Sequence, residues 1–203
     1  MIEPQSITEA VPFSDVVARV SDLEAIVASS LGQAPPTQPP VTGASFANTL
    51  SAATAQGTPG SSASALVSAA QSQVGQAEQP PGSNDGPAVA TYRTAVQGAE
   101  EGQPWCADFV SWAAAQAGKP LGDAGQGLGS VSEITSWAQR TGRYLPAGTA
   151  PQPGDLILFG TEHVGLVESV NPDGSLTTIE GNYENAVTRV HRMPGEATGY
   201  VRV

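Results

Sequence analysis

The chain has 203 residues, and its 19 acidic side chains outnumber its 8 lysines and arginines, which gives a formal net charge of −11 at pH 7. So few basic residues cannot form the basic face that binds nucleic acid or an anionic membrane surface, and we expect neither partner. The single cysteine excludes an intramolecular disulfide.

The start of the sequence lacks the features of a secretory signal peptide. Residues 1–4 carry no basic side chain, and no apolar run of about 7–15 residues follows them. No stretch approaches the roughly 18–20 apolar residues of a membrane span. We therefore expect no membrane span and, if the protein works outside the cytoplasm, an export route other than the ordinary signal peptide.

Residues 1–31 are interpreted as an N-terminal segment with a short amphipathic helix at 14–31. Ser14 is a suitable N-cap, and apolar residues follow at helical spacing: Val16, Val20, Leu23, Val27 and Leu31. A helix this short is not stable alone, so its apolar side would bury against a protein partner, a second copy or the domain. The alternative is a transient helix in a disordered tail.

Residues 32–62 have the composition of a linker. The proline-rich run at 33–40 favours an extended and fairly stiff chain. Phe46 and Leu50 are four residues apart and could form one weak apolar helical turn, which glycine, proline and serine at 57–62 would end.

Residues 63–203 show the periodicity of a folded domain. Helical spacing predicts helices near 63–75, 87–96, 104–118 and 131–141. The period then changes to two, which predicts strands at 155–159, 163–170, 175–182, 188–193 and 200–203. Helices followed by antiparallel strands indicate an α+β domain.

Cys106 lies at the start of the third of these helices. Pro104 suits the first turn of a helix, whereas Gly118 and Pro120 mark its end. The unpaired N–H groups and the dipole of a helix N-terminus stabilise a negative charge, and the thiolate is the nucleophilic form of cysteine. The alternative is a buried structural thiol, which behaves as a small apolar side chain.

A predicted hairpin brings polar residues together. Residues 171–174 (Asn-Pro-Asp-Gly) have the composition of a tight turn. If residue 170 pairs with residue 175, His163 lies opposite Asn182 and Gly165 opposite Glu180, all on one face. Glu180 could then lean across Gly165 toward His163, although a three-residue loop with a bulge would shift this register by one. Singly, these residues could instead be a strand-end histidine, a solvated glutamate and a turn asparagine.

Together with Cys106, these polar residues form the arrangement of cysteine-dependent acyl transfer, with a thiol, a base and a residue that orients the base. Residues 63–203 also resemble the CHAP family, the cysteine- and histidine-dependent amidohydrolases/peptidases that cleave bacterial cell walls. Four segments in the family's order carry the resemblance, namely 105–110 (Trp-Cys-Ala-Asp-Phe-Val), 153–159 (Pro-Gly-Asp-Leu-Ile-Leu-Phe), 162–167 (Glu-His-Val-Gly-Leu-Val) and 179–182 (Ile-Glu-Gly-Asn).

The resemblance implies a papain-like fold, in which a helix bearing the nucleophile packs on an antiparallel sheet bearing the base. It also implies that Cys106 is the nucleophile, His163 the base, Glu180 the residue that orients the imidazole and Asn182 a second polar neighbour. The backbone N–H of Cys106 would stabilise the oxyanion. Gln103 and Tyr92 are candidates for an additional side-chain donor, and with Trp105 they are the expected substrate contacts.

We expect no cofactor and no bound metal. Some family members bind calcium ahead of the cysteine, but residues 84–86 (Asn-Asp-Gly) offer a single carboxylate, and calcium usually collects about 6–8 oxygens. His191, Arg189 and Arg192 are interpreted as a solvated edge strand rather than a second site.

The implied activity is hydrolysis of an amide bond in peptidoglycan, either the N-acetylmuramoyl-L-alanine amide or a stem or cross-bridge peptide bond. Residues 1–62 resemble the segment that precedes cell-wall hydrolase domains encoded with actinobacterial flagellar genes, through the helix at 14–31 and the Phe-Ala-Asn-Thr-Leu motif at 46–50. We therefore expect action at the cell wall, periplasmic or extracellular, after a non-standard and flagellum-linked export. The alternatives are a thiol amidohydrolase of a small non-wall amide and a non-enzymatic binding protein associated with a flagellum or secretion system.

Overall fold

A computed structural model describes residues 59–193 and 195–203. The expected amphipathic helix at 14–31, the expected helical turn at 46–50 and most of the expected linker at 32–62 lie outside these residues.

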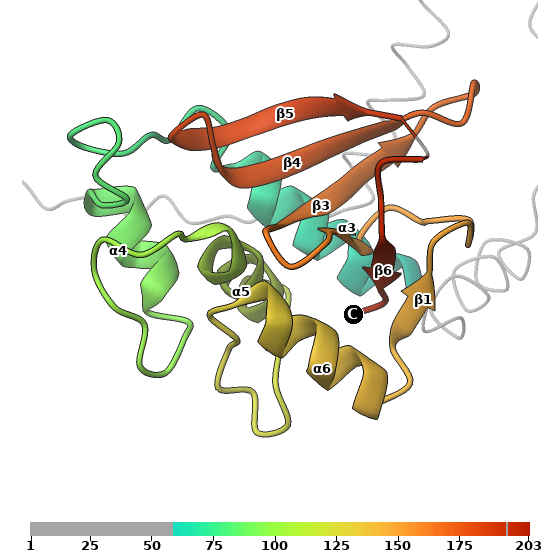
Figure 1. The fold of residues 1–203 in the computed structure, drawn as a ribbon, viewed down its shortest axis with the longest axis horizontal. Coiled ribbons are helices and arrows are strands. Elements are labelled where there is room, and N and C mark those ends of the chain that lie inside the picture. The colour runs from blue at the N-terminus through green and yellow to red at the C-terminus, as the bar shows by residue number, and fades with distance from the viewer. Residues whose placement is uncertain (1–58, 194) are drawn as a thin grey trace, which may run out of the picture. The chain divides into compact units, whose positions relative to one another are not determined.

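The described domain is α+β, as the sequence predicted, with its described helices before all of its strands (Figure 1). The four described helices are α3 (Pro59–Gln71), α4 (Pro87–Arg93), α5 (Cys106–Gln116) and α6 (Val131–Arg140). The strands are β1 (Tyr144–Pro146), β2 (Leu156–Phe159), β3 (His163–Val170), β4 (Leu176–Tyr183), β5 (Ala186–Arg192) and β6 (Gly199–Val201). They form one antiparallel sheet in the order β1-β6-β2-β3-β4-β5.

Several helix boundaries differ from the sequence-based expectation, among them the end of α3 at Gln71 instead of residue 75. Helix α3 begins at Pro59, inside the segment expected to be linker and four residues before the expected start at 63. Proline suits the first helical position because its fixed φ is helical and its missing N–H has no intrahelical acceptor there. Helix α4 ends at Arg93 rather than near residue 96. Strand β1 was not expected, since three residues are too few to show a period of two.

Both ends of the segment between α5 and α6 are fixed by local hydrogen bonds. After α5, Gly118 has φ +70°, and the N–H groups of Gly118 and Lys119 bond to the carbonyls of Ala115 and Ala114, which is a Schellman end. Before α6, the Ser130 hydroxyl and the Glu133 carboxylate form a capping box. These caps define the loop that lies beside Cys106.

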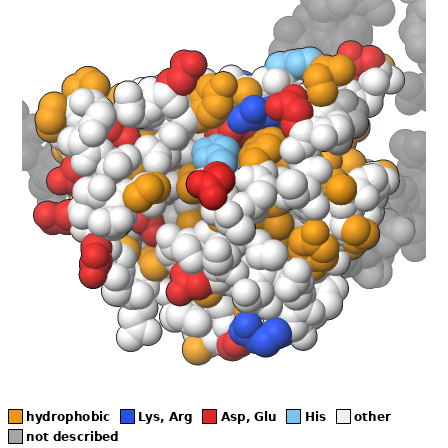
Figure 2. Space-filling model, viewed as in Figure 1, with side chains coloured by type: hydrophobic (Ala, Val, Ile, Leu, Met, Phe, Trp, Pro, Cys, Tyr) orange, Lys and Arg blue, Asp and Glu red, His pale blue; other side chains and the backbone are white. Residues whose placement is uncertain are grey.

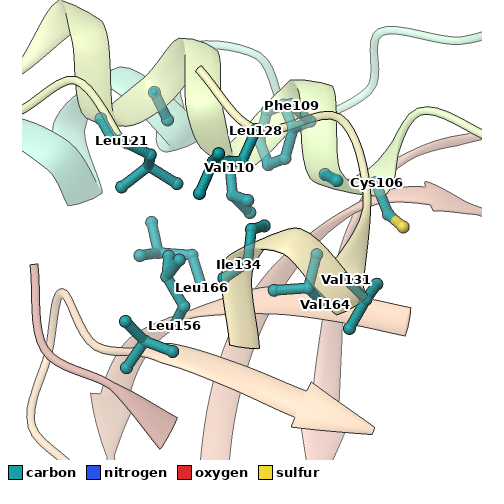
Figure 3. Close-up of a cluster of buried hydrophobic side chains, with 14 of the residues drawn as sticks. Cys106, Phe109, Val110, Leu121, Leu128, Val131, Ile134, Leu156, Val164 and Leu166 are labelled. Atoms are coloured by element: carbon teal, nitrogen blue, oxygen red, sulfur yellow. The ribbon is translucent and has the colours of Figure 1, made fainter. Parts of the chain in front are cut away.

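The hydrophobic core lies between the helices and one face of the sheet. Alternate residues of β2 face opposite sides, so Leu156 and Leu158 join the main core whereas Ile157 joins a smaller cluster on the other face. Helix α5 is central to the main core, and Figure 3 shows Phe109 and Val110 from it among side chains from α6, β2 and β3.

Glycine at position 181 allows α5 to approach the sheet closely. A Cβ atom on Gly181 would lie 2.6 Å from Cβ of Phe109 and 2.8 Å from the Trp105 ring, closer than side chains tolerate. The first turn of α5 therefore lies directly against β4. Among the described residues, no helix has the length and apolar character that crossing a membrane would need.

Candidate active site

Cys106 is the first residue of α5, so the predicted position in the first helical turn is correct. Pro104 is not in that turn, however, because Trp105 is the N-cap and Pro104 precedes it. The thiol is 5% exposed, and Figure 3 shows its sulfur at the edge of the apolar cluster, directed away from Leu121 and Val110. Cys106 also lines a pocket of about 620 Å³, so its thiol is not enclosed by the core.

The pocket lies where three loops meet the start of α5. Its lining residues come from 96–104, from 126–133 and from the tip at 161–162, together with Cys106 and the two residues after it. A pocket of this size is in the range that holds small-molecule and peptide side-chain ligands. The thiol therefore faces a space that can receive a substrate group.

His163 is the first residue of β3, and a buried carboxylate holds its ring. The Nε2 atom lies 2.8 Å from Oε2 of Glu180, whose side chain is fully buried. Burial lowers the pKa of His163, but the neighbouring Cys106 thiol and the Glu180 carboxylate outweigh burial and raise it to about 9. Because Nε2 is bonded to Glu180, Nδ1 is the ring nitrogen that remains for proton exchange with the neighbouring thiol.

The hairpin register explains how Glu180 reaches His163. Near the turn Val170 pairs with Leu176, one residue away from the expected pairing, but a bulge between Val167 and Ser169 restores the expected register at the site. Gly165 and Glu180 therefore face each other as predicted, and a Cβ on Gly165 would lie only 2.7 Å from Cγ of Glu180. The Glu180 side chain therefore extends across β3 through the space that a side chain at position 165 would fill.

Arg192, at the end of β5, binds both oxygens of Glu180. Its Nε lies 2.8 Å from Oε1 and its Nη2 lies 2.6 Å from Oε2, and the Thr178 hydroxyl donates to Oε1 at 2.6 Å. Burial raises the pKa of Glu180, but these donors and His163 together lower it to about 2. The interpretation of Arg192 as a solvated edge residue was wrong, since its side chain is only 15% exposed.

Two aromatic rings complete the surroundings of the imidazole. Phe159 stacks on His163 with ring centroids 5.8 Å apart, and the Arg192 guanidinium lies 4.4 Å from the centre of the Phe159 ring and 5.1 Å from that of Tyr183. Arg192 is thus fixed by cation–π contacts as well as by its bidentate ion pair.

Among the described residues, the side chain of Asn182 makes its hydrogen bonds with Trp105, Glu78 and Asn84 and not with His163. The backbone of Asn182 has φ +60° at an irregularity in the β4–β5 pairing, which removes its side chain from the strand alternation. Its Oδ1 accepts from the backbone N–H of Trp105 at 3.3 Å, and its Nδ2 donates to Glu78 and Asn84. Asn182 therefore connects β4 to the N-cap of the helix that carries Cys106.

Glu78 is a buried carboxylate that the sequence did not single out. Its Oε1 accepts from the Trp105 indole at 2.9 Å and from Asn182 at 2.9 Å, and its Oε2 accepts from the backbone of Asn84. No local pattern marks this residue, because two of its three partners, Trp105 and Asn182, lie in distant parts of the sequence. Together these contacts fix the start of α5 from two sides.

The three expected substrate contacts lie in different places. Gln103 is exposed and lines the pocket. Tyr92 and Trp105 are fully buried, and their polar atoms bond to Gln73 and Glu78 respectively. The expectation that these two rings contact substrate was wrong, because both are parts of the aromatic core, stacked on each other with centroids 5.6 Å apart.

The loop at 84–86 is held by protein groups. Oδ1 of Asp85 accepts from the Arg93 guanidinium at 2.8 Å and from the backbone N–H of Gly86 at 2.8 Å, and these donors hold the pKa of Asp85 below its usual range. Arg93 also donates to the carbonyl of Asn84.

A helix-borne thiol that faces a sheet-borne imidazole defines the papain-like class of α+β proteins. Residues 98–182 match the CHAP domain, a family of amidase/peptidase hydrolases. No curated protein and no solved structure matches the chain.

Proposed function

We propose that this protein is a peptidoglycan hydrolase that cleaves an amide bond through a cysteine acyl-enzyme. The bond is either the N-acetylmuramoyl-L-alanine amide or a peptide bond of the stem or cross-bridge. The observation that supports the proposal best is the His163–Glu180 contact of 2.8 Å beside a thiol at a helix N-terminus that opens to a pocket.

The proposed reaction uses the thiol of Cys106 as the nucleophile and the imidazole of His163 as base and acid in turn. His163 takes the proton of the Cys106 thiol, and the thiolate attacks the carbonyl carbon of the scissile amide. The imidazolium then gives that proton to the leaving amine as the C–N bond breaks, which leaves a thioester. A water molecule, deprotonated by His163, attacks the thioester carbonyl, and the carboxylic acid product leaves as the thiol is restored.

Glu180 orients the imidazole in this proposal. Its carboxylate holds Nε2–H, so that Nδ1 remains directed toward the sulfur and the imidazolium is stabilised when it forms. Because Arg192 and Thr178 already hold the carboxylate, Glu180 stays ionised and keeps its position during the reaction.

The start of α5 also provides a site for the developing oxyanion. Cys106 is the first helical residue, and its backbone N–H has no acceptor within the helix. That N–H can therefore stabilise the negative oxygen of the tetrahedral intermediate, with the exposed amide of Gln103 as the candidate second donor.

Zymography on purified cell walls tests the proposal. We expect clearing by the wild-type protein and none by the Cys106→Ala and His163→Ala variants. His191→Ala is the matched control, since His191 lies on the far strand β5 and should be dispensable. Mass spectrometry of the released fragments identifies the newly freed amino group and hence the bond. Equal clearing by Cys106→Ala and wild type would end the proposal.

A further inference from the structure

The pocket beside Cys106 is lined by acidic side chains from separate parts of the chain: Glu100, Asp108, Glu133 and Glu162. Among the described residues that line it there is no lysine, arginine or histidine. The face in Figure 2 shows the same imbalance, with acidic side chains widely spread and basic ones in only a few places. The pocket therefore favours a positively charged group over a negative one.

Asp108 differs from the other three carboxylates because it is buried. It lies on α5 two residues after Cys106, is 4% exposed and still lines the pocket. Gly129 lies on the opposite wall of the pocket, and a Cβ atom on it would be 3.4 Å from Oδ1 of Asp108. Within the described part of the chain the Asp108 carboxylate accepts no hydrogen bond, and burial raises its pKa to about 6. Among the described residues, Nε of Arg93 is the enclosed side-chain N or O atom without a partner, so the Asp108 oxygens are reached from the pocket and can accept a donor there.

The charged groups around Asp108 are already occupied by other contacts. Glu133 accepts the N–H groups of Gly129 and Ser130 as part of the α6 cap. The positive charge of Arg93 lowers the pKa of Asp108. The two terminal nitrogens of Arg93, however, donate to Asp85 and to the carbonyl of Asn84. Neither neighbour gives the Asp108 carboxylate a direct donor.

We propose that Asp108 binds an ammonium group of the substrate, which makes the pocket a subsite for a free amine next to the scissile bond. This inference rests on the proposed amide hydrolysis and adds the substrate class. The amine is either the side chain of a diamino acid or the free N-terminus of a peptide. A single buried carboxylate suits an ammonium ion, which needs a few acceptors, better than calcium, which collects about 6–8 oxygens.

The first experiment compares cell-wall peptidoglycan before and after exhaustive N-acetylation, which removes every free amine. We expect the wild-type protein to cleave the native material at least about 30-fold faster than the acetylated material, the scale of losing one partner of a buried ion pair. Asp108→Asn should bring the two rates close together by lowering only the rate on native material. Glu101→Gln, which removes an equal charge from an exposed position outside the pocket, should keep the wild-type ratio.

Two results would overturn the inference. Equal wild-type rates on both materials would show that no amine is recognised. An equal loss by Asp108→Asn on both materials would show a structural role, such as balancing the Arg93 charge. If wild type cleaves neither material, the proposed function fails instead.

Binding to the inactive Cys106→Ala variant gives a readout that does not depend on turnover. Calorimetry with soluble muropeptides should show binding that acetylation weakens by a similar factor. Muropeptides acetylated only at the N-terminus or only at the diamino side chain then identify which amine is bound. The subsite is excluded if the four forms bind alike or none binds.

Discussion

Arg192 and Glu180 form a bidentate ion pair in which each carboxylate oxygen receives its own donor, Nε to Oε1 at 2.8 Å and Nη2 to Oε2 at 2.6 Å. Oε2 also faces Nε2 of His163. Arg192 therefore fixes the acceptor to which the imidazole is bonded, although it lies two strands away from His163 in the sheet.

The first prediction concerns replacement of Arg192 by lysine. Lysine keeps the charge but cannot reach both oxygens or stack on Phe159 in the same way, so Glu180 and the imidazole lose their fixed orientation. We expect kcat to fall by about 100-fold, the scale of a misplacement of about 1 Å, with KM nearly unchanged. Steady-state kinetics on a soluble muropeptide measures both constants, and the pH profile should shift because the imidazolium is less stabilised.

Arg189→Lys is the matched control for this prediction. Arg189 lies on the same strand and pairs with Glu168, which is remote from the imidazole, and its side chain is 48% exposed. We expect less than about a twofold change in kcat, because exposed ion pairs contribute little. Similar losses in the two variants would mean that Arg192 acts through β5 as a whole rather than through Glu180.

The second prediction is the dependence of stability on pH. The pKa of Glu180 is about 2 in the folded protein, below its ordinary 4.5, so its contribution is present above about pH 4.5 and is lost as the pH falls toward 2. The pKa of His163 is about 9, above its ordinary 6.5, so its contribution is present below about pH 6.5 and is lost as the pH rises through 9.

Thermal unfolding between pH 3 and pH 10 tests this dependence. The melting temperature should be highest near pH 4–5 and decline on both sides, because the raised pKa of Asp108 removes stability between about pH 3.8 and pH 6. His163→Ala should remove most of the decline between pH 6.5 and 9, whereas His191→Ala should keep it. An unchanged alkaline slope in His163→Ala would show that another group causes the decline.

The sequence predicted the parts of the site that depend on local pattern. Cys106 was placed in the first turn of a helix by Pro104 and by the apolar spacing that follows it, although Pro104 itself precedes the N-cap. Glu180 was placed opposite Gly165 by the period of two. The register at the site was correct although the pairing at the turn was not, because the bulge after Val167 compensates for the longer loop.

The remaining parts depend on contacts between segments that no local pattern relates. Arg192 lies close to Arg189 and His191 on an edge strand, so this polar segment was interpreted as exposed to solvent. Only the pairing of β5 with β4 brings the Arg192 side chain to Glu180. Asn182 left the predicted face because its φ is +60°, a conformation that an asparagine can adopt without any mark in the sequence. Tyr92 was a candidate side-chain donor and Trp105 an expected substrate contact, and no local pattern shows that both rings pack in the core.

The third prediction concerns Glu78, which holds the Trp105 indole and the Asn182 amide. Glu78→Gln keeps the shape but replaces one acceptor oxygen by a donor, so one of the buried N–H groups loses its partner. We expect a loss of about 1–3 kcal/mol in the free energy of unfolding, measured by urea denaturation. A loss below about 0.5 kcal/mol would indicate that the start of α5 is held by apolar packing alone.

The fourth prediction concerns Gly165, the position over which Glu180 crosses the hairpin. In Gly165→Ala the new methyl group would lie 2.7 Å from Cγ of Glu180 and 3.4 Å from Cγ2 of Ile157, so the carboxylate must move. We expect a loss of about 1–3 kcal/mol in stability from overpacking and a fall of about 100-fold in kcat from displacement of Glu180. Gly195→Ala is the matched control, since a Cβ there meets no atom within 4 Å. If Gly165→Ala lost stability but kept its kcat, the position of Glu180 would matter for folding and not for the reaction.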